Sequence, residues 1–156
     1  RSAFSDTLAT VRRGGVVPVG AGKNKAQAWE PKIITRNGQK VAFLAFGSML
    51  TPCLEAAEVL NATVANMRFI KPLDDYLVAS LADSHDLLVT VEENTVMGGA
   101  GSAVAESLNS QRINVKVLHL GLPDVFIDQG DHAQMLADCG LDKNGLIKSV
   151  RSMLPE

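Results

Sequence analysis

The segment from Val89 to Glu106 constrains the fold of this chain more than any other. Its first residues, Val89–Val91, have the apolar and β-branched character of a buried strand. Two carboxylates follow, and a glycine-rich turn then opens a helix near Ala103. A strand, a short turn and a helix form the repeating unit of α/β proteins. The segment therefore predicts an α/β fold, and its turn is a candidate anion-binding or interface site made of Glu92, Glu93, Gly98, Gly99, Gly101 and Ser102.

Strand-like and helix-like segments alternate along the rest of the chain. Strands are expected at residues 32–35, 40–46, 63–67, 87–91 and 115–120. Helices are expected at residues 51–60, 74–81, 103–109, 131–138 and 142–154. This order predicts a three-layer α/β sandwich around a five-stranded, mostly parallel mixed sheet. Because Asn37-Gly38 is a strong hairpin signal, residues 32–35 are expected to pair antiparallel with residues 40–46 as an edge strand.

The composition limits the kinds of partner. The 156 residues have a net charge of -2, and their basic residues are not interleaved with aromatic ones, which argues against nucleic-acid binding. The longest wholly apolar run, Val41–Phe46, is too short to cross a bilayer. Cys53 and Cys139 lie far apart and outside any Cys-x-x-Cys pair, which is typical of reduced thiols in a cytoplasmic protein. We therefore expect neither a nucleic-acid nor a membrane partner.

The chain is expected to divide near Pro31. Residues 1–30 are rich in glycine and hold no helical or strand period, which indicates a linker or the remnant of a preceding domain. Residues 31–156 contain all the expected helices and strands. One domain of ordinary size therefore follows the linker.

The glycine-rich turn has two interpretations. Glycines before a helix can bring backbone amides close to a phosphate. A dinucleotide site, however, needs glycines directly after the strand and an acid about 20 residues further on. Here residues 92–97 intervene, and the downstream position falls near His119-Leu120, where no carboxylate lies. We favour the interpretation that the small residues let the helix pack closely on the sheet.

The titratable residues predict no catalytic set and no metal site. Glu92 and Glu93 are adjacent on a strand, so their side chains are expected on opposite faces. His85, His119 and His132 have no metal-ligand spacing. His119 is expected to be a hydrogen-bonded histidine of the sheet. A strand-to-helix turn contains three further polar residues: Arg68, Lys71 and Asp74. We favour a structural role in which the turn is fixed and Asp74 caps the helix. In the alternative, Arg68 or Lys71 meets Glu92 or Glu93.

Several segments together resemble a known family. They are Asn66–Asp74 (NMRFIKPLD), Val89–Asn94 (VTVEEN), Met97–Ser102 (MGGAGS) and Leu120–Gly130 (LGLPDVFIDQG). Residues 32–155 are similar to the C-terminal domain of 1-deoxy-D-xylulose-5-phosphate synthases. The Lys-Pro-Leu-Asp, Glu-Glu and glycine-turn elements are also shared with transketolases and the β subunits of 2-oxo-acid dehydrogenases. The Leu120–Gly130 segment narrows the resemblance to the synthases.

The resemblance implies a function for a larger protein. Such synthases use thiamine diphosphate and Mg²⁺ to join a two-carbon unit from pyruvate to D-glyceraldehyde 3-phosphate, and the product feeds isoprenoid, thiamine and pyridoxal synthesis. Their catalytic and cofactor-binding motifs lie in two upstream domains, so this chain is expected to contain no catalytic or cofactor-binding residue. Its implied role is to pack on those domains and on a second subunit of a cytoplasmic homodimer. Residues Ala9–Gly15 lack the family's Arg-Tyr-Pro-Arg-Gly motif, so phosphate binding is not assigned to Arg12 or Arg13.

Two alternatives remain open from the sequence. In the first, the turn binds a regulatory anion or nucleotide at the amides of Gly101–Ala103. In the second, the chain is a partner-docking domain of a 2-oxo-acid dehydrogenase-like enzyme. That version predicts an exposed apolar patch on the last two helices. Under the synthase-domain interpretation, by contrast, the isolated chain is expected neither to turn over pyruvate nor to bind thiamine diphosphate tightly.

Overall fold

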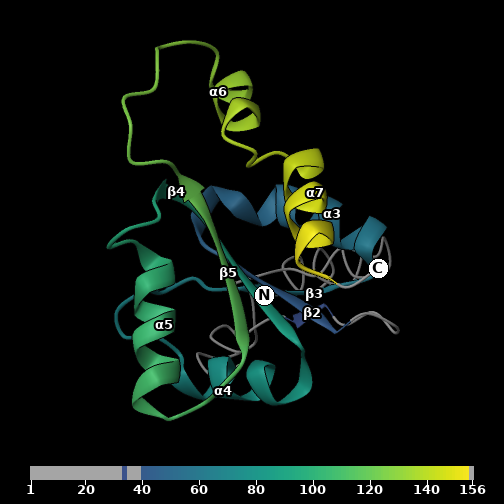
Figure 1. Cartoon of the computed structure of the whole chain (residues 1–156), viewed down its shortest axis with the longest axis vertical. Coiled ribbons are helices and arrows are strands. Elements are labelled where there is room, and N and C mark those ends of the chain that lie inside the picture. Colours follow the sequence, from purple (N-terminus) through teal and green to yellow (C-terminus); the bar gives the residue numbers. More distant parts are fainter. Residues whose placement is uncertain (1–32, 35–39, 155–156) are drawn as a thin grey trace, which may run out of the picture. The chain divides into compact units, whose positions relative to one another are not determined.

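A parallel β-sheet lies at the centre of the part of the chain that the structure describes, residues 33–34 and 40–154 of a computed structural model (Figure 1). Its parallel strands are β2 (Val41–Ala45), β3 (Thr63–Asn66), β4 (Leu87–Thr95) and β5 (Lys116–Leu122). They lie in the order β3-β2-β4-β5. A two-residue strand, β1 (Ile33–Ile34), pairs antiparallel with β3 at one edge.

Helices cover both faces of this sheet. On one face the apolar core joins the sheet to α3 (Leu50–Leu60) and α7 (Lys143–Met153). On the other face it joins the sheet to α4 (Asp75–Ser84) and α5 (Ala100–Ser110). A short 3-10 helix, η1 (Gly47–Met49), runs directly into α3, and α6 (His132–Asp138) precedes α7.

Strand β2 shows why this sequence gives two cores. Phe43 lies in the core on the α3 side and Leu44 in the core on the α4 side, and both are fully buried. Successive side chains of a strand point to opposite faces, so an all-apolar strand must be covered on both. The run Val41–Phe46 is therefore a central strand rather than one side of an exposed hairpin.

Polar side chains fix the ends of several helices. The carboxylate of Asp74 accepts a hydrogen bond from the Leu77 amide at 2.9 Å, as the sequence predicts. Asp131 and Asp142 cap α6 and α7 in the same way. Asn61 ends α3 in the left-handed conformation with φ 53°, also as expected. The predicted cap at Thr51 is wrong, because η1 continues into α3 and places Met49 at its N-cap.

The prediction of an α/β fold with a mainly parallel sheet is confirmed. The expected antiparallel pairing of residues 32–35 with residues 40–46 is wrong, because both edges of β2 are occupied by parallel neighbours, β3 and β4. Four strands make up the parallel sheet, and the antiparallel contribution consists of the two residues of β1 beside β3. The Asn37-Gly38 turn and the predicted linker, residues 1–30, lie outside the described residues.

Strand β4 is longer than the sequence predicts. It continues through Glu92 and Glu93 to Thr95, whereas the apolar pattern ends at Val91. The two cysteines are free thiols, and burial raises the pKa of the Cys53 thiol. Among the helices of the described residues, none has the length and apolar character needed to cross a membrane.

Candidate functional site

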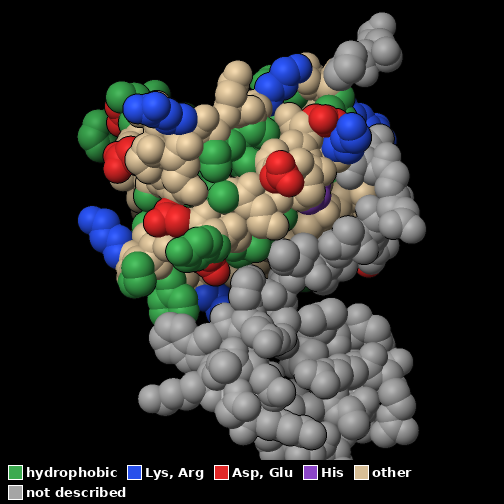
Figure 2. Space-filling view, turned by 90° about the horizontal axis from the view of Figure 1, so that it is seen from below, with side chains coloured by type: hydrophobic (Ala, Val, Ile, Leu, Met, Phe, Trp, Pro, Cys, Tyr) green, Lys and Arg blue, Asp and Glu red, His purple; other side chains and the backbone are tan. Residues whose placement is uncertain are grey.

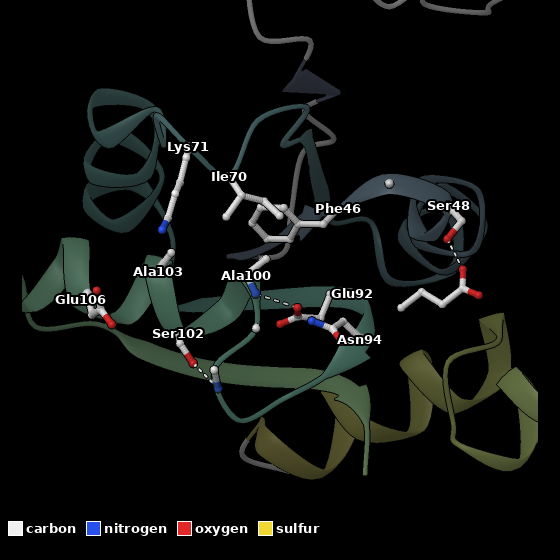
Figure 3. Close-up of a pocket in the computed structure, with 14 residues that line it drawn as sticks. Phe46, Ser48, Ile70, Lys71, Glu92, Asn94, Ala100, Ser102, Ala103 and Glu106 are labelled. Carbon is white, nitrogen blue, oxygen red and sulfur yellow. Dashed lines mark hydrogen bonds between the residues drawn. The ribbon is translucent and has the colours of Figure 1, made fainter. Parts of the chain in front are cut away.

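A cleft of about 590 Å³ opens at the carboxyl ends of β2 and β4 (Figure 3). The chain runs from β2 to β3 on one side and returns to β4 on the other, so this is the point where the strand order reverses. Open α/β sheets commonly bind ligands at such a point. The lining combines the ends of these strands with the loops before α4 and α5: Phe46, Gly47, Ser48, Ile70, Lys71, Glu92, Glu93, Asn94, Gly98, Gly99, Ala100, Ser102, Ala103 and Glu106.

The carboxylate of Glu92 closes one wall of the cleft. One oxygen, Oε2, accepts from the Ala100 amide at 2.6 Å, and Oε1 accepts from the Gly101 amide at 2.8 Å. Glu92 is only 4% exposed. The N-cap residue of α5, Gly99, provides no side-chain cap, so Glu92 satisfies these amides from the neighbouring strand. Figure 3 shows this contact between Glu92 and Ala100.

This geometry argues against an external anion at the helix N-terminus. The Gly101 amide, the first of the three amides that the anion hypothesis needs, already donates to Glu92. The Ser102 amide donates to the Gly99 carbonyl at 3.1 Å. A phosphate would also meet the buried negative charge of Glu92 at close range.

The glycines of the turn allow the start of α5 to lie very close to the side chains of the sheet. A Cβ atom at Gly99 would collide with Oε2 of Glu92. One at Gly101 would lie 2.7 Å from both Nδ1 of His119 and Oγ1 of Thr90. Gly98 has φ +77°, and its amide donates to the Ser102 hydroxyl at 3.1 Å. These contacts support the packing interpretation of the turn.

Glu93 lies on the opposite face of β4 and forms a separate polar cluster. Its carboxylate accepts from the Ser48 hydroxyl and contacts Nε2 of His132, the latter at 2.5 Å. These hydrogen bonds, first that of His132 and then that of Ser48, lower the pKa of Glu93. The same contact raises the pKa of His132. Glu93 therefore links the start of α6 to η1, and the predicted separation of the two glutamates is found.

The remaining polar residues make structural contacts. Nδ1 of His119 is 2.7 Å from the Thr90 hydroxyl on the paired strand, and burial lowers the pKa of His119. His85 contacts the Thr63 hydroxyl at 2.8 Å. Lys71 lines the cleft, and within the described chain it forms no ion pair with Glu92 or Glu93, so the alternative contact is not found.

The described residues do not fit thiamine diphosphate or Mg²⁺. A diphosphate needs free amides or several cations, whereas the cleft offers Lys71 against the carboxylates of Glu92, Glu93 and Glu106. No group of three or more metal-ligating side chains occurs in the described ranges. We therefore derive no catalytic step through either group on this chain.

The surface of the described residues can be compared with what a nucleic-acid partner or a docked partner enzyme would need. On the face in Figure 2, Lys and Arg side chains of the described residues are scattered and interspersed with Asp and Glu. The apolar patch that a partner-docking domain would present on α6 and α7 is missing: within those two helices, Met153 is the one large apolar side chain that is exposed. The docking alternative therefore lacks the feature that it predicts.

The contact between Glu92 and the amides at the start of α5 was not predicted from the sequence. Sequence reasoning placed Glu92 at the end of a strand and the glycines at the start of a helix, but it did not connect them. A signal was present, because the helix beginning at Ala100 has glycine at its N-cap and no polar cap of its own. The Ser48 contact of Glu93 had no comparable signal, since these residues are distant in sequence.

Together the fold and the site define an α/β domain with a parallel sheet covered by helices on both faces and a switch-point cleft whose helix terminus is capped internally. The chain belongs to the transketolase C-terminal domain family, because the family model described as "Transketolase, C-terminal domain" matches residues 32–146.

Among curated proteins, the chain is similar to 1-deoxy-D-xylulose-5-phosphate synthases. The chain is 69% identical over 118 residues to a 1-deoxy-D-xylulose-5-phosphate synthase of Nitrosomonas europaea, covering 76% of this chain and 19% of that protein. It is 62% identical over 146 residues to the synthase of Nitrosospira multiformis, covering 89% of this chain and 24% of that protein. The chain thus spans about a fifth to a quarter of the length of these relatives.

A solved structure supports the fold. The neighbour described as "Split gene transketolase, inactive beta4 tetramer" has a TM-score of 0.69 and 32% identity, and the match covers 88% of this chain and 45% of that one. A transketolase-like domain therefore accounts for most of the sequence.

Proposed function

We propose that this chain is the C-terminal domain of a 1-deoxy-D-xylulose-5-phosphate synthase. The observation that carries the proposal is the 69% identity to the synthase of Nitrosomonas europaea. The whole polypeptide would convert pyruvate and D-glyceraldehyde 3-phosphate to 1-deoxy-D-xylulose 5-phosphate and CO₂, with thiamine diphosphate and Mg²⁺ held by its other domains. Such an enzyme would serve isoprenoid and thiamine synthesis in the cytoplasm as a homodimer.

Within that enzyme the chain would supply packing surface and no reacting group. The buried Glu92 is committed to the N-terminus of α5, and the histidines bond to neighbouring side chains. The split-gene neighbour is described as an "inactive beta4 tetramer", where beta4 refers to its subunits and not to a strand. Its inactivity supports the expectation that this part of a transketolase-type enzyme does not react without the rest.

The test is to express the complete polypeptide that carries this sequence and to assay it with both substrates. The proposal predicts CO₂ release that depends on D-glyceraldehyde 3-phosphate, with one 1-deoxy-D-xylulose 5-phosphate formed per CO₂. The 156-residue chain alone, assayed in parallel, should release none. A complete polypeptide that transfers a two-carbon unit between sugar phosphates but ignores pyruvate would be a transketolase and would contradict the proposal.

A further inference from the structure

The large apolar side chains that remain exposed are unevenly distributed. Most of them lie in loops that follow the carboxyl ends of the strands: Phe69, Ile70, Met97, Val125 and Phe126. The others, Val59, Tyr76 and Met153, lie near the ends of α3, α4 and α7. We call the first set the carboxyl-edge surface. Grouped apolar side chains of this kind mark interaction sites, whereas single ones do not.

The loop between β5 and α6 projects most from this surface. Figure 1 shows it reaching away from the sheet. Val125 is 68% exposed, and Phe126 is fully exposed within the described part of the chain. Burying a phenylalanine side chain is strongly favourable, so leaving one in water forgoes a large stabilisation. A partner that covers Phe126 would recover it.

The loop is also held in place. His132, the first residue of α6, contacts Glu93 on β4, and Asp131 caps the helix just before it. Contacts from the sheet therefore fix the position at which residues 123–131 return to the body of the domain. An anchored loop loses less conformational entropy on docking than a free one.

Charge indicates what the loop would meet. Residues 123–131 contain Asp124, Asp128 and Asp131 and no lysine or arginine. A complementary surface would be an apolar pocket for Phe126 bordered by basic side chains. The cleft at the same edge of the sheet adds Glu93 and Glu106 against Lys71, so a second copy of this edge would bring like charges together.

The size of the relatives identifies the occupant. This chain covers 24% and 19% of two of them, so in such proteins a domain of this kind is joined to a partner several times its own length. A tethered partner is present at an effective concentration of about a millimolar, far above that of a second molecule. Interfaces between domains of one chain commonly bury about 600 to 1,500 Å².

We propose that the carboxyl-edge surface, anchored by Phe126, docks onto the remaining part of the same synthase polypeptide through an apolar pocket with a basic rim. This inference rests on the proposed function, because it takes that polypeptide to be the synthase. It goes further by assigning the docking surface to one edge of the sheet and by naming its central side chain.

The experiment uses the complete polypeptide with the photocrosslinking substitution Phe126→p-benzoylphenylalanine. The matched control is Val59→p-benzoylphenylalanine, because Val59 is 49% exposed but lies away from the carboxyl edge. Position 126 should crosslink to residues upstream of this domain in the same molecule, and position 59 should not. Mixing isotopically light and heavy protein separates links within one molecule from links between two.

Crosslinks from position 126 that join two copies, or no yield above that of the control, would contradict the inference. A second variant protects against misfolding of the first: Phe126→Ser should speed amide exchange in residues 123–131 about tenfold or more in the complete polypeptide, whereas Val59→Ser should not. An active synthase without these crosslinks would contradict the docking surface but not the proposed function. Crosslinks in a protein that makes no 1-deoxy-D-xylulose 5-phosphate would contradict the proposed function but not the docking surface.

Discussion

At the scale of single residues, Glu92 is the group on which the site depends most. It replaces the missing cap of α5 with a carboxylate from the neighbouring strand. Negative charge at a helix N-terminus is favourable in itself, and burial strengthens both hydrogen bonds. The contact thus fixes α5 against β4 and fills the position where an anion would otherwise bind.

Replacing Glu92 with glutamine tests this role. In the Glu92→Gln variant one carboxylate oxygen becomes an NH2 group, which is a donor and would face a backbone N–H donor. One of the two buried backbone amides therefore loses its acceptor. We expect the free energy of unfolding to fall by about 2 to 3 kcal/mol, measured by urea denaturation. Glu106→Gln is the matched control, because Glu106 lies on the same helix, α5, but is exposed, and it should change stability by less than about 0.5 kcal/mol. Equal losses in both variants would contradict the capping role of Glu92.

The glycine at position 101 should be nearly irreplaceable. A Cβ atom there would lie 2.7 Å from the side chains of both His119 and Thr90, so Gly101→Ala forces α5 away from the sheet. Overpacking of this kind costs about 1 to 3 kcal/mol. At Gly130 the nearest atom to an added Cβ is Cγ of Met135 at 3.7 Å, so Gly130→Ala should be close to neutral. Calorimetric melting of both variants distinguishes the packing role from general sensitivity to glycine loss.

These residues show where reasoning from sequence stops. The opposite placement of Glu92 and Glu93 follows from strand geometry alone and is found. The hydrogen-bond partners of Glu92 do not follow from the sequence, because they depend on how far α5 folds back over β4. The spacing test that argued against a dinucleotide site agrees with the geometry, since the intervening residues extend β4 and carry the capping carboxylate.

At the scale of elements, α6 is attached to the sheet by a contact that depends on pH. No side chain of α6 is fully buried, and Leu136 packs against the core only partly buried, so the contact between His132 and Glu93 also helps to fix the position of α6. Glu93 has a lowered pKa, so its contribution is present above its usual value of 4.5 and is lost as pH falls through the lowered value. His132 has a raised pKa, so its contribution is complete below 6.5 and is lost as pH rises through the raised value.

The contact should therefore be strongest between about pH 4.5 and 6.5. A proton NMR titration of His132 should give a midpoint above the usual imidazole value. Asp131 also raises the pKa of His132, so Glu93→Gln should move the midpoint most of the way back rather than fully. Glu55→Gln, at an exposed position of α3, should leave it unchanged. A His132 midpoint that does not respond to Glu93→Gln would rule out the contact.

The element order was predictable, while one pairing was not. Alternating apolar and amphipathic segments suffice for the parallel sheet, because each strand needs cover on both faces. The Asn37-Gly38 signal led to a wrong partner for residues 32–35, because β2 sits in the middle of the sheet with both edges taken. Local turn signals carry no information about which strands a crossover will later place beside a central one.

At the scale of the whole molecule, we interpret this chain as a domain that completes a larger enzyme. Its family match spans residues 32–146, and the matched part, 89% and 76% of this chain, makes up 24% and 19% of two synthase relatives, which are therefore about four times its length. The cleft at the switch point is the usual place for a ligand in such a sheet. Here internal contacts and surplus carboxylates leave it unsuited to a diphosphate.

We propose that this chain contributes packing and no cofactor-binding or reacting group. Isothermal titration calorimetry of the 156-residue chain with thiamine diphosphate and Mg²⁺ tests this proposal, with the complete polypeptide as the positive control. We expect no saturable heat up to about 1 mM cofactor for the chain and clear saturation for the complete polypeptide. Saturable one-to-one binding to the chain below about 1 mM would contradict the claim.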